Sequence, residues 1–442
     1  MLPLLALATL LLGLSSGRAW IPGQGVVDAP VGATSGDEPH YLLLVHSLLR
    51  DGDLDLGPDH AALAAGEDRA GARFVGVDLD HHTWVVDDAR GERALWSELY
   101  DWRRPQRCEP GASDCVRWRK LDARLPESSA TRVERPAHPP ASALVTAALL
   151  WPWRDDAAAI ERGAVSLSAV WIVATLLATA ALAARLGLGG GGQAAAVALL
   201  LASPLLAYGH GVFSEPLAAL SLTSAAWAWQ RERPSLTGAL AAFAAAIKPP
   251  WALLGLALLA WGWRSDALRR RFAVVWIGGG GLLVLANLWL VGGPVISGQL
   301  GWQWVASPMA LPATWIDGRH GLLPFVPWAI LALPSLLRGG ALAVFGPGLA
   351  ALAALLTVFG SLGEVCFGPR LWLPVLPLLA VAAVDAARAV RASWRPIWRR
   401  WLWLCAVWAG AAAAPGVLAW SAAWEQPAYA LLRVALRRML AG

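Results

Sequence analysis

Charged side chains are scarce in this chain of 442 residues. They make up 15% of it, against 57% apolar residues, which leaves too few charges to cover the surface of a soluble globule of this size. Lysine is almost absent: Lys120 and Lys248 are the only two, so arginine carries nearly all of the positive charge. A lipid-facing surface is the simplest explanation of this balance, and the sequence predicts an all-α polytopic membrane protein.

The chain also lacks several motifs that define classes of enzyme. It has no Walker motif, no GxGxxG after a predicted strand and no nucleotide-sugar signature, so direct use of a cytoplasmic nucleotide donor is not expected. It has no CxxC and no Cys/His set with zinc spacing. The net charge of +5 does not indicate nucleic acid, because the arginines fall in short runs between apolar segments, as in cytoplasmic loops.

Only four cysteines are present, and Cys108 and Cys115 share one polar loop. In an oxidising compartment this pair could close a small disulfide ring, whereas otherwise both would be free thiols. Spacing does not fix connectivity, so both alternatives stay open.

Hydrophilic and apolar stretches divide the chain into five parts. Residues 1–20 predict a first span or a signal-like segment, 21–136 an extracytoplasmic loop with an interfacial helix, 137–153 a re-entrant or interfacial segment, 154–427 a multi-span domain and 428–442 an amphipathic tail. Several apolar segments of the multi-span domain are shorter than the roughly 20 residues that cross a bilayer upright.

The topology depends on residues 137–153. If this stretch stays on the outer side, the arginines between the later segments become cytoplasmic, and if it crosses, all of them move outside. The first alternative predicts about eleven spans, with the amino terminus inside. The arginines concerned are Arg185, Arg231, Arg233, Arg264, Arg269–Arg271, Arg338, Arg388, Arg391, Arg395, Arg399 and Arg400.

This topology brings polar residues of several loops to the outer face. They lie in the loop 21–136, the turn 210–216, at Lys248, in the loop 292–321 and in the turn 360–370. Asp37 and Glu38 head the predicted interfacial helix, where Glu38-Pro39 suits a helix start and the residues from Tyr41 to Leu49 give an apolar face of helical period. Such a pair is either an ordinary capped start or a pair of carboxylates held for chemistry.

Six motifs in chain order resemble the bacterial relatives of the protein O-mannosyltransferase and aminoarabinose transferase superfamily. They are GDEPHYLLLVHSLLRDGDLDL, the HPP of 138–140, the FSEPLAAL of 213–220, the IKPP of 247–250, the WIDGRHGLLPFVPWAILALP of 315–334 and the FGPRLWLPVLPLLAV of 367–381. The resemblance implies a GT-C-type glycosyltransferase that takes a sugar from a polyprenyl phosphate and transfers it at the outer face of the membrane. It leaves the sugar and the acceptor, which could be a lipid, a glycan or a protein, unnamed.

The same resemblance suggests roles for particular residues. Asp37 would be the general base that takes the proton of the acceptor, and Glu38 would orient the acceptor or help to hold a divalent cation. Arg370 is the first candidate for binding the donor phosphate, because a guanidinium binds two phosphate oxygens in fork geometry. Lys248 is the second candidate. His40, Glu215, His138 and His320 are further candidates for contact with the acceptor or a metal, each weighed against an ordinary role as a helix cap, turn or surface residue.

One more cluster is tempting as a metal site but lacks the order of a known metal motif. Asp78, Asp80, His81, His82, Asp87 and Asp88 lie within eleven residues and are interpreted as a polar loop. Two other functions compete with the transferase: a transporter or flippase of lipid-linked sugar, and a membrane protein that binds such lipids without chemistry. The absence of an internal repeat and the gathering of charge at one face favour the enzyme.

Overall fold

The computed structural model describes about two thirds of the chain. The described residues are Pro3, Thr9, 18–21, 25–28, 38–59, 83–87, 92–95, 132–136, 138–263, 265–291, 314–317, 320–337, 342–359, 369–390 and 392–418. Within them the protein is mostly helical, as the composition predicts.

Short strands are the part of the fold that an all-α prediction misses. Arg18–Ile21 (β1) pairs antiparallel with Gly25–Asp28 (β2), and a second sheet has the order β4-β3-β5, with Thr83–Asp87 (β3) between Glu92–Leu95 (β4) and Arg132–Pro136 (β5). Pairing of β3 with β5 ties together residues about fifty positions apart. Leu56 N donates to Glu134 O, which joins the segment that follows the helix at residues 38–50 to β5.

The predicted interfacial helix is present as Glu38–Arg50 (α2). It begins at Glu38 with Pro39 in its first turn, as the Glu-Pro start predicts. Its core side is wider than the expected apolar face, because His40, His46 and Ser47 are buried together with Tyr41–Val45. Ala141–Leu150 (α5) packs against it, followed by the 3-10 turn Trp151–Trp153 (η2).

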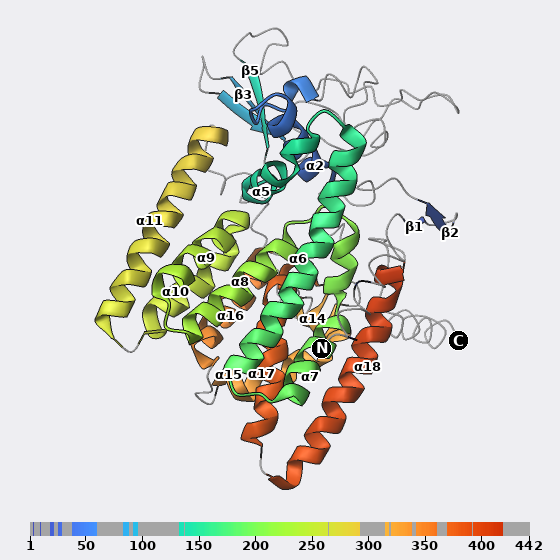
Figure 1. Ribbon diagram of the computed structural model, residues 1–442, viewed down its shortest axis with the longest axis vertical. Coiled ribbons are helices and arrows are strands. Elements are labelled where there is room, and N and C mark those ends of the chain that lie inside the picture. Colours follow the sequence, from blue (N-terminus) through green and yellow to red (C-terminus); the bar gives the residue numbers. More distant parts are fainter. Residues whose placement is uncertain are drawn as a thin grey trace, which may run out of the picture.

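The rest of the chain forms a bundle of helices and shorter 3-10 turns (Figure 1). In chain order they are Ala157–Arg185 (α6), Gly190–Leu201 (α7), Pro204–His210 (η3), Glu215–Gln230 (α8), Pro234–Ile247 (α9), Pro249–Trp251 (η4), Ala252–Trp261 (α10), Asp266–Val291 (α11), Leu322–Phe325 (α14), Pro327–Ala332 (η5), Leu333–Leu337 (α15), Ala343–Phe345 (η6), Gly346–Phe359 (α16), Arg370–Val375 (η7), Leu376–Ala389 (α17), Ala392–Trp394 (η8) and Arg395–Leu418 (α18).

Three helices of the described part are long and apolar enough to cross a membrane. They are Ala157–Arg185, Arg370–Arg388 and Ala392–Leu418, and the pair α7 and η3, bent by 60°, would make a fourth. Proline explains why other apolar segments are shorter than expected: residues 322–337 contain Pro324, Pro327 and Pro334 and form three short pieces rather than one helix. The number of about eleven spans therefore stays a prediction.

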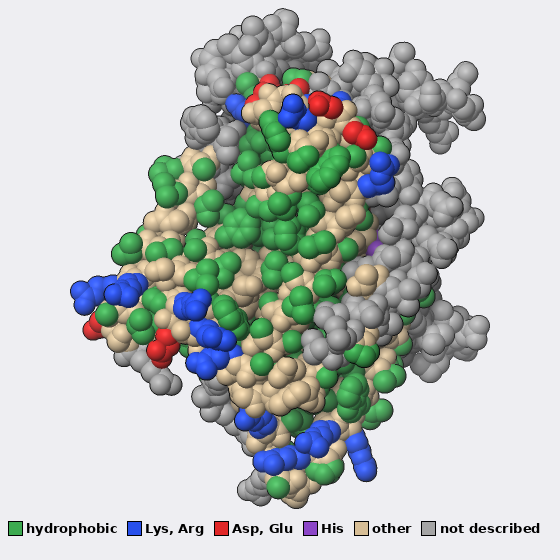
Figure 2. Space-filling view, in the orientation of Figure 1, with side chains coloured by type: hydrophobic (Ala, Val, Ile, Leu, Met, Phe, Trp, Pro, Cys, Tyr) green, Lys and Arg blue, Asp and Glu red, His purple; other side chains and the backbone are tan. Residues whose placement is uncertain are grey.

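Large apolar side chains face outward on several of these helices. On α11, Val274, Ile277, Leu282 and Leu285 are each more than half exposed and recur with helical period. Trp401, Leu404 and Val407 do the same on α18. Figure 2 shows apolar side chains over much of the middle of the visible face. Such a surface is consistent with a protein embedded in lipid.

Arginines gather at the end of the bundle away from α2. Arg185 Nε donates to Gln230 O at 3.0 Å, and Arg388 Nη1 donates to Leu186 O at 2.9 Å, so the last turns of α6, α8 and α17 meet there. Figure 2 shows many basic side chains over the lower half of the visible face, while those at its top lie beside acidic side chains. The sixteen residues of α8 rise roughly 24 Å from Glu215 to this end, which is comparable with the roughly 30 Å of a bilayer core.

Candidate functional site

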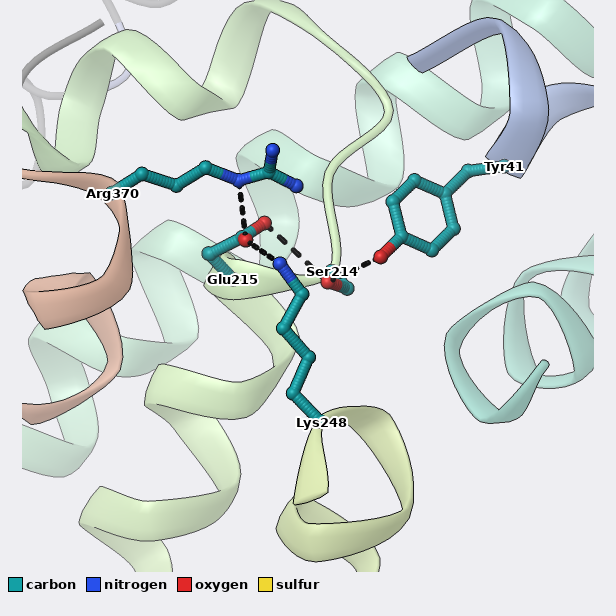
Figure 3. Close-up of polar contacts among 5 residues, drawn as sticks. All are labelled: Tyr41, Ser214, Glu215, Lys248 and Arg370. Atoms are coloured by element: carbon teal, nitrogen blue, oxygen red, sulfur yellow. Dashed lines mark hydrogen bonds and ion pairs between the residues drawn. The ribbon is translucent and has the colours of Figure 1, made fainter. Parts of the chain in front are cut away.

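Glu215, Lys248 and Arg370 form a buried ionic cluster, here called the ionic trio (Figure 3). Glu215 Oε1 accepts hydrogen bonds from Lys248 Nζ and from Arg370 Nε, the latter at 2.6 Å. The three side chains are 0%, 7% and 4% exposed. Three positions that the sequence marked separately, 33 to 155 residues apart, therefore meet at one point.

Helix ends place these three side chains. Glu215 begins α8, where the positive end of the helix dipole favours a carboxylate. Lys248 is the last residue before the Pro-Pro turn η4, so Pro249 ends α9 at this depth and the lysine extends past it. Arg370 is the first residue of η7. The helix α8 and the segment η7–α17 run from the trio to the arginine end, and α9 runs from the arginine end to Lys248. The trio therefore lies at the opposite end of these helices, near α2.

The trio carries two cations and one carboxylate, a formal excess of one positive charge. Burying charges costs several kcal/mol per ion unless partners offset the loss of water. Glu215 offsets part of that cost for both cations at once. An ammonium has three donors and a guanidinium five, so each can make hydrogen bonds besides the one to Glu215. Two cationic groups that meet at one buried point are of the kind that binds anions.

Ser214 connects the trio to α2 through a short chain of hydroxyl groups. Ser214 Oγ donates to Glu215 Oε2 at 3.4 Å, and the Tyr41 hydroxyl lies 3.1 Å from Ser214 Oγ. Ser214 stands at the N-cap of α8, a position where serine usually caps, yet its side chain caps no backbone N–H. Its hydroxyl turns to the site instead.

The segment Gly211–Glu215, here called the site turn, contacts a different element at nearly every residue. Val212 N donates to Glu38 Oε1 at 2.7 Å, so the first carboxylate of α2 holds the backbone of the site turn. A Cβ on residue 211 would lie 1.7 Å from that same Oε1, so any residue other than glycine would displace the Glu38 carboxylate. The Arg370 guanidinium lies over the Phe213 ring, 5.2 Å from its centroid.

His40 and His138 lie beside the same region. The His138 ring is 4.8 Å from the Tyr41 ring and 5.9 Å from the His40 ring, and both histidines are buried. A narrow crevice adjoins them, lined by Tyr41, Ser142, Ser168, Trp171 and Phe213 among others. Ser142 is 7% exposed and its Oγ has no hydrogen-bond partner among the described residues, so this crevice offers an unused polar atom.

The structure brings together most of the residues that the sequence singled out. Glu38, His40, His138, Glu215, Lys248 and Arg370 all lie around the site turn or α2. His320 instead lies 3.5 Å from the Asp317 carboxylate, a partner three residues earlier. The remaining predicted residues fall outside the described part of the chain: Asp37, Cys108, Cys115 and the 78–88 cluster, of which only Asp87 in β3 is described.

The geometry gives two of the predicted candidates a different environment from the expected one. Glu215 was considered for a metal or acceptor, but two cations occupy its Oε1 and would repel a metal ion. Glu38 uses Oε1 to accept a backbone N–H. No group of three or more His, Cys, Asp or Glu side chains suited to a metal occurs in the described parts of the chain.

Tyr41, Phe213 and Ser214 are site residues for which sequence reasoning assigned no role. Tyr41 belongs to the apolar face of a predicted helix, which masked its hydroxyl, and Phe213 and Ser214 were part of a motif carried by Glu215. A serine directly before Glu-Pro at a helix start reads as a cap. Only the fold reveals that its hydroxyl serves the carboxylate.

The fold and the site together define a mostly helical protein, consistent with a membrane protein, with a buried ionic cluster near one end of its helices. Comparison of the chain with models of protein families, with curated proteins and with solved structures found no match.

Proposed function

We propose that the protein is a membrane-embedded GT-C-type glycosyltransferase that moves a sugar from a polyprenyl-phosphate donor to an acceptor outside the cytoplasm. The observation that carries the proposal is the ionic trio, which buries two cationic side chains at the end of the bundle opposite the arginines. A lipid phosphate has the charge and the membrane depth that such a cluster can bind. The motif resemblance supports the same donor.

In the proposed reaction the two cations stabilise the charge that develops on the leaving phosphate. Arg370 can bind two phosphate oxygens in fork geometry, and Lys248 adds a compact charge beside it. Low exposure of the trio strengthens these interactions, because little water competes for them. Asp37 directly precedes α2 in the chain and is the proposed general base.

The proposed orientation places the trio on the outer side of a bacterial plasma membrane. The buried trio and the exposed arginines lie at opposite ends of α8, and arginines gather on the cytoplasmic side of membrane proteins. Reporter fusions at Arg233, Arg269 and Arg395 are expected to read cytoplasmic. A periplasmic reading at Arg233 would remove the outward site.

Transport of lipid-linked sugar is the second candidate. The 60° bend between α7 and η3 favours it, because transporters use broken helices around their binding sites. Both candidates bind a lipid phosphate, so binding alone does not separate them. Transfer of sugar to an acceptor by purified protein separates them, since a transporter moves the lipid without breaking its glycosyl bond.

The deciding experiment measures transfer from polyprenyl-phosphate sugars by the purified wild-type protein and by Asp37→Asn. The amide cannot accept a proton at neutral pH, and loss of one general base lowers rates by roughly 100- to 10,000-fold. Asparagine caps helices as well as aspartate does, so thermal unfolding should change little. Normal turnover by a normally folded Asp37→Asn protein would show that this carboxylate is only a cap.

A further inference from the structure

We infer that Tyr41 and Ser214 are positioning residues that hold the ionic trio in register with the start of α2. The inference rests on the proposed function for its kinetic consequence, although the linkage itself is a property of the fold. Its basis is a chain of contacts through the site turn: α2 contacts Val212 and Ser214, and Ser214 in turn donates to Glu215 of the trio.

Counting protons sets the direction of the hydroxyl chain. An ionised carboxylate can only accept hydrogen bonds, so the single hydroxyl proton of Ser214 is donated to Glu215 Oε2. Ser214 Oγ can then only accept from the Tyr41 hydroxyl, which lies 3.1 Å away. The chain therefore runs from Tyr41 through Ser214 to Glu215, and each donor fixes the next group.

This chain determines how Glu215 presents its two oxygens. With Oε2 held by Ser214, Oε1 faces both Lys248 and Arg370. The ammonium and the guanidinium are thereby held beside the same carboxylate oxygen, which keeps the two cationic groups close together for a phosphate. Tyr41 reaches this arrangement from α2, one helical turn beyond Glu38, so the position of the trio depends on the position of α2.

A second contact between α2 and the site turn makes the linkage rigid. Glu38 Oε1 accepts from Val212 N at 2.7 Å and fits against Gly211. Val212 and Ser214 of the site turn are thus attached to Glu38 and Tyr41, which lie three residues apart on α2, and the two attachments prevent rotation of the turn about either one. The contact joins the start of α2, which directly follows the proposed base in the chain, to the segment that carries Glu215.

Tyr41→Phe and Ser214→Ala test the inference in the full-length protein. Neither change alters the charge of the trio, so the KM for a polyprenyl-phosphate sugar should stay within about threefold. Loss of register misplaces the reacting groups, and small misplacements cost up to about 100-fold in rate. We expect kcat to fall at least tenfold in both variants.

Ser221→Ala is the matched control for Ser214→Ala. Ser221 lies on the same helix, is 3% exposed and donates to Leu240 O at 2.7 Å, but it does not touch the trio. It should lose stability without losing kcat. A wild-type kcat in folded Tyr41→Phe and Ser214→Ala proteins would overturn the inference.

A double-mutant cycle keeps the inference testable if the wild-type protein transfers no sugar. Tyr41→Phe and Glu215→Gln should shift the melting temperature in detergent by less together than the sum of their separate shifts, by about 1 °C or more, because one chain joins them. The pair Ser221→Ala and Glu215→Gln should be additive. Additive shifts for Tyr41 and Glu215 would exclude the linkage, whereas an inactive wild type with a coupled pair would reject the proposed function alone.

Discussion

The two ends of the helical bundle handle charge in opposite ways. At the α2 end, Glu215, Lys248 and Arg370 are at most 7% exposed and bind one another. At the other end, Arg269 and Arg388 are 43% and 54% exposed and make longer contacts of 3.6 and 3.8 Å with carboxylates on their own helices. An exposed ion pair contributes little to the free energy of unfolding, because both charges stay in water. Burying charges costs free energy, so buried charges are expected where the fold or a ligand requires them. This contrast is the reason that the proposed site is at the α2 end.

The largest expected effect comes from removing the shared carboxylate. Glu215→Ala leaves two cations buried without it, and breaking a buried ion pair in this way costs about 3–5 kcal/mol. Asp266→Ala breaks the exposed pair with Arg269 and should cost about 0.2–1 kcal/mol. Unfolding of both variants in the same detergent measures the difference. Equal losses would remove the distinction between the two ends.

A smaller effect is expected where glycine allows α2 to approach the site turn. In Gly211→Ala the added methyl group would displace the Glu38 carboxylate from Val212 N, and a hydrogen bond to a charged group contributes about 1.5–3 kcal/mol. Gly190→Ala is the control at the arginine end, because a Cβ there meets nothing within 4 Å. Thermal unfolding compares the two, and an unchanged Gly211→Ala protein would argue against the clamp at Glu38.

The smallest expected effect concerns binding rather than stability. Arg370→Lys keeps the positive charge but loses the fork geometry, so affinity for undecaprenyl phosphate should fall about tenfold, equivalent to about 1.4 kcal/mol. Arg388→Lys makes the same change at the arginine end, where the side chain binds the backbone of Leu186, and should leave affinity unchanged. A loss of similar size in both variants would mean that the arginine end contributes to lipid-phosphate binding.

Several features follow from local sequence alone. The start of α2 at Glu38 is a matter of proline placement, which acts within one turn of helix. Proline also ends α9 beside Lys248 and divides residues 322–337 into short pieces. The short strands were not expected, since β3 and β5 pair across about fifty residues and neither carries a strong alternating pattern.

The amino-acid sequence by itself determined that the protein is apolar and mostly helical, and where its charged residues fall. It also marked Lys248, Glu215 and Arg370 as candidate site residues. Composition and spacing act locally, so they are legible without a fold. Only the tertiary structure decided that one oxygen of Glu215 accepts from both cations, and that Tyr41 is linked to the other oxygen through Ser214. Apart from the one between the neighbours Ser214 and Glu215, these contacts join residues 33 to 173 positions apart, and nothing in the sequence around either partner specifies the other. Their distances are set by how helices pack, which is a property of the whole bundle.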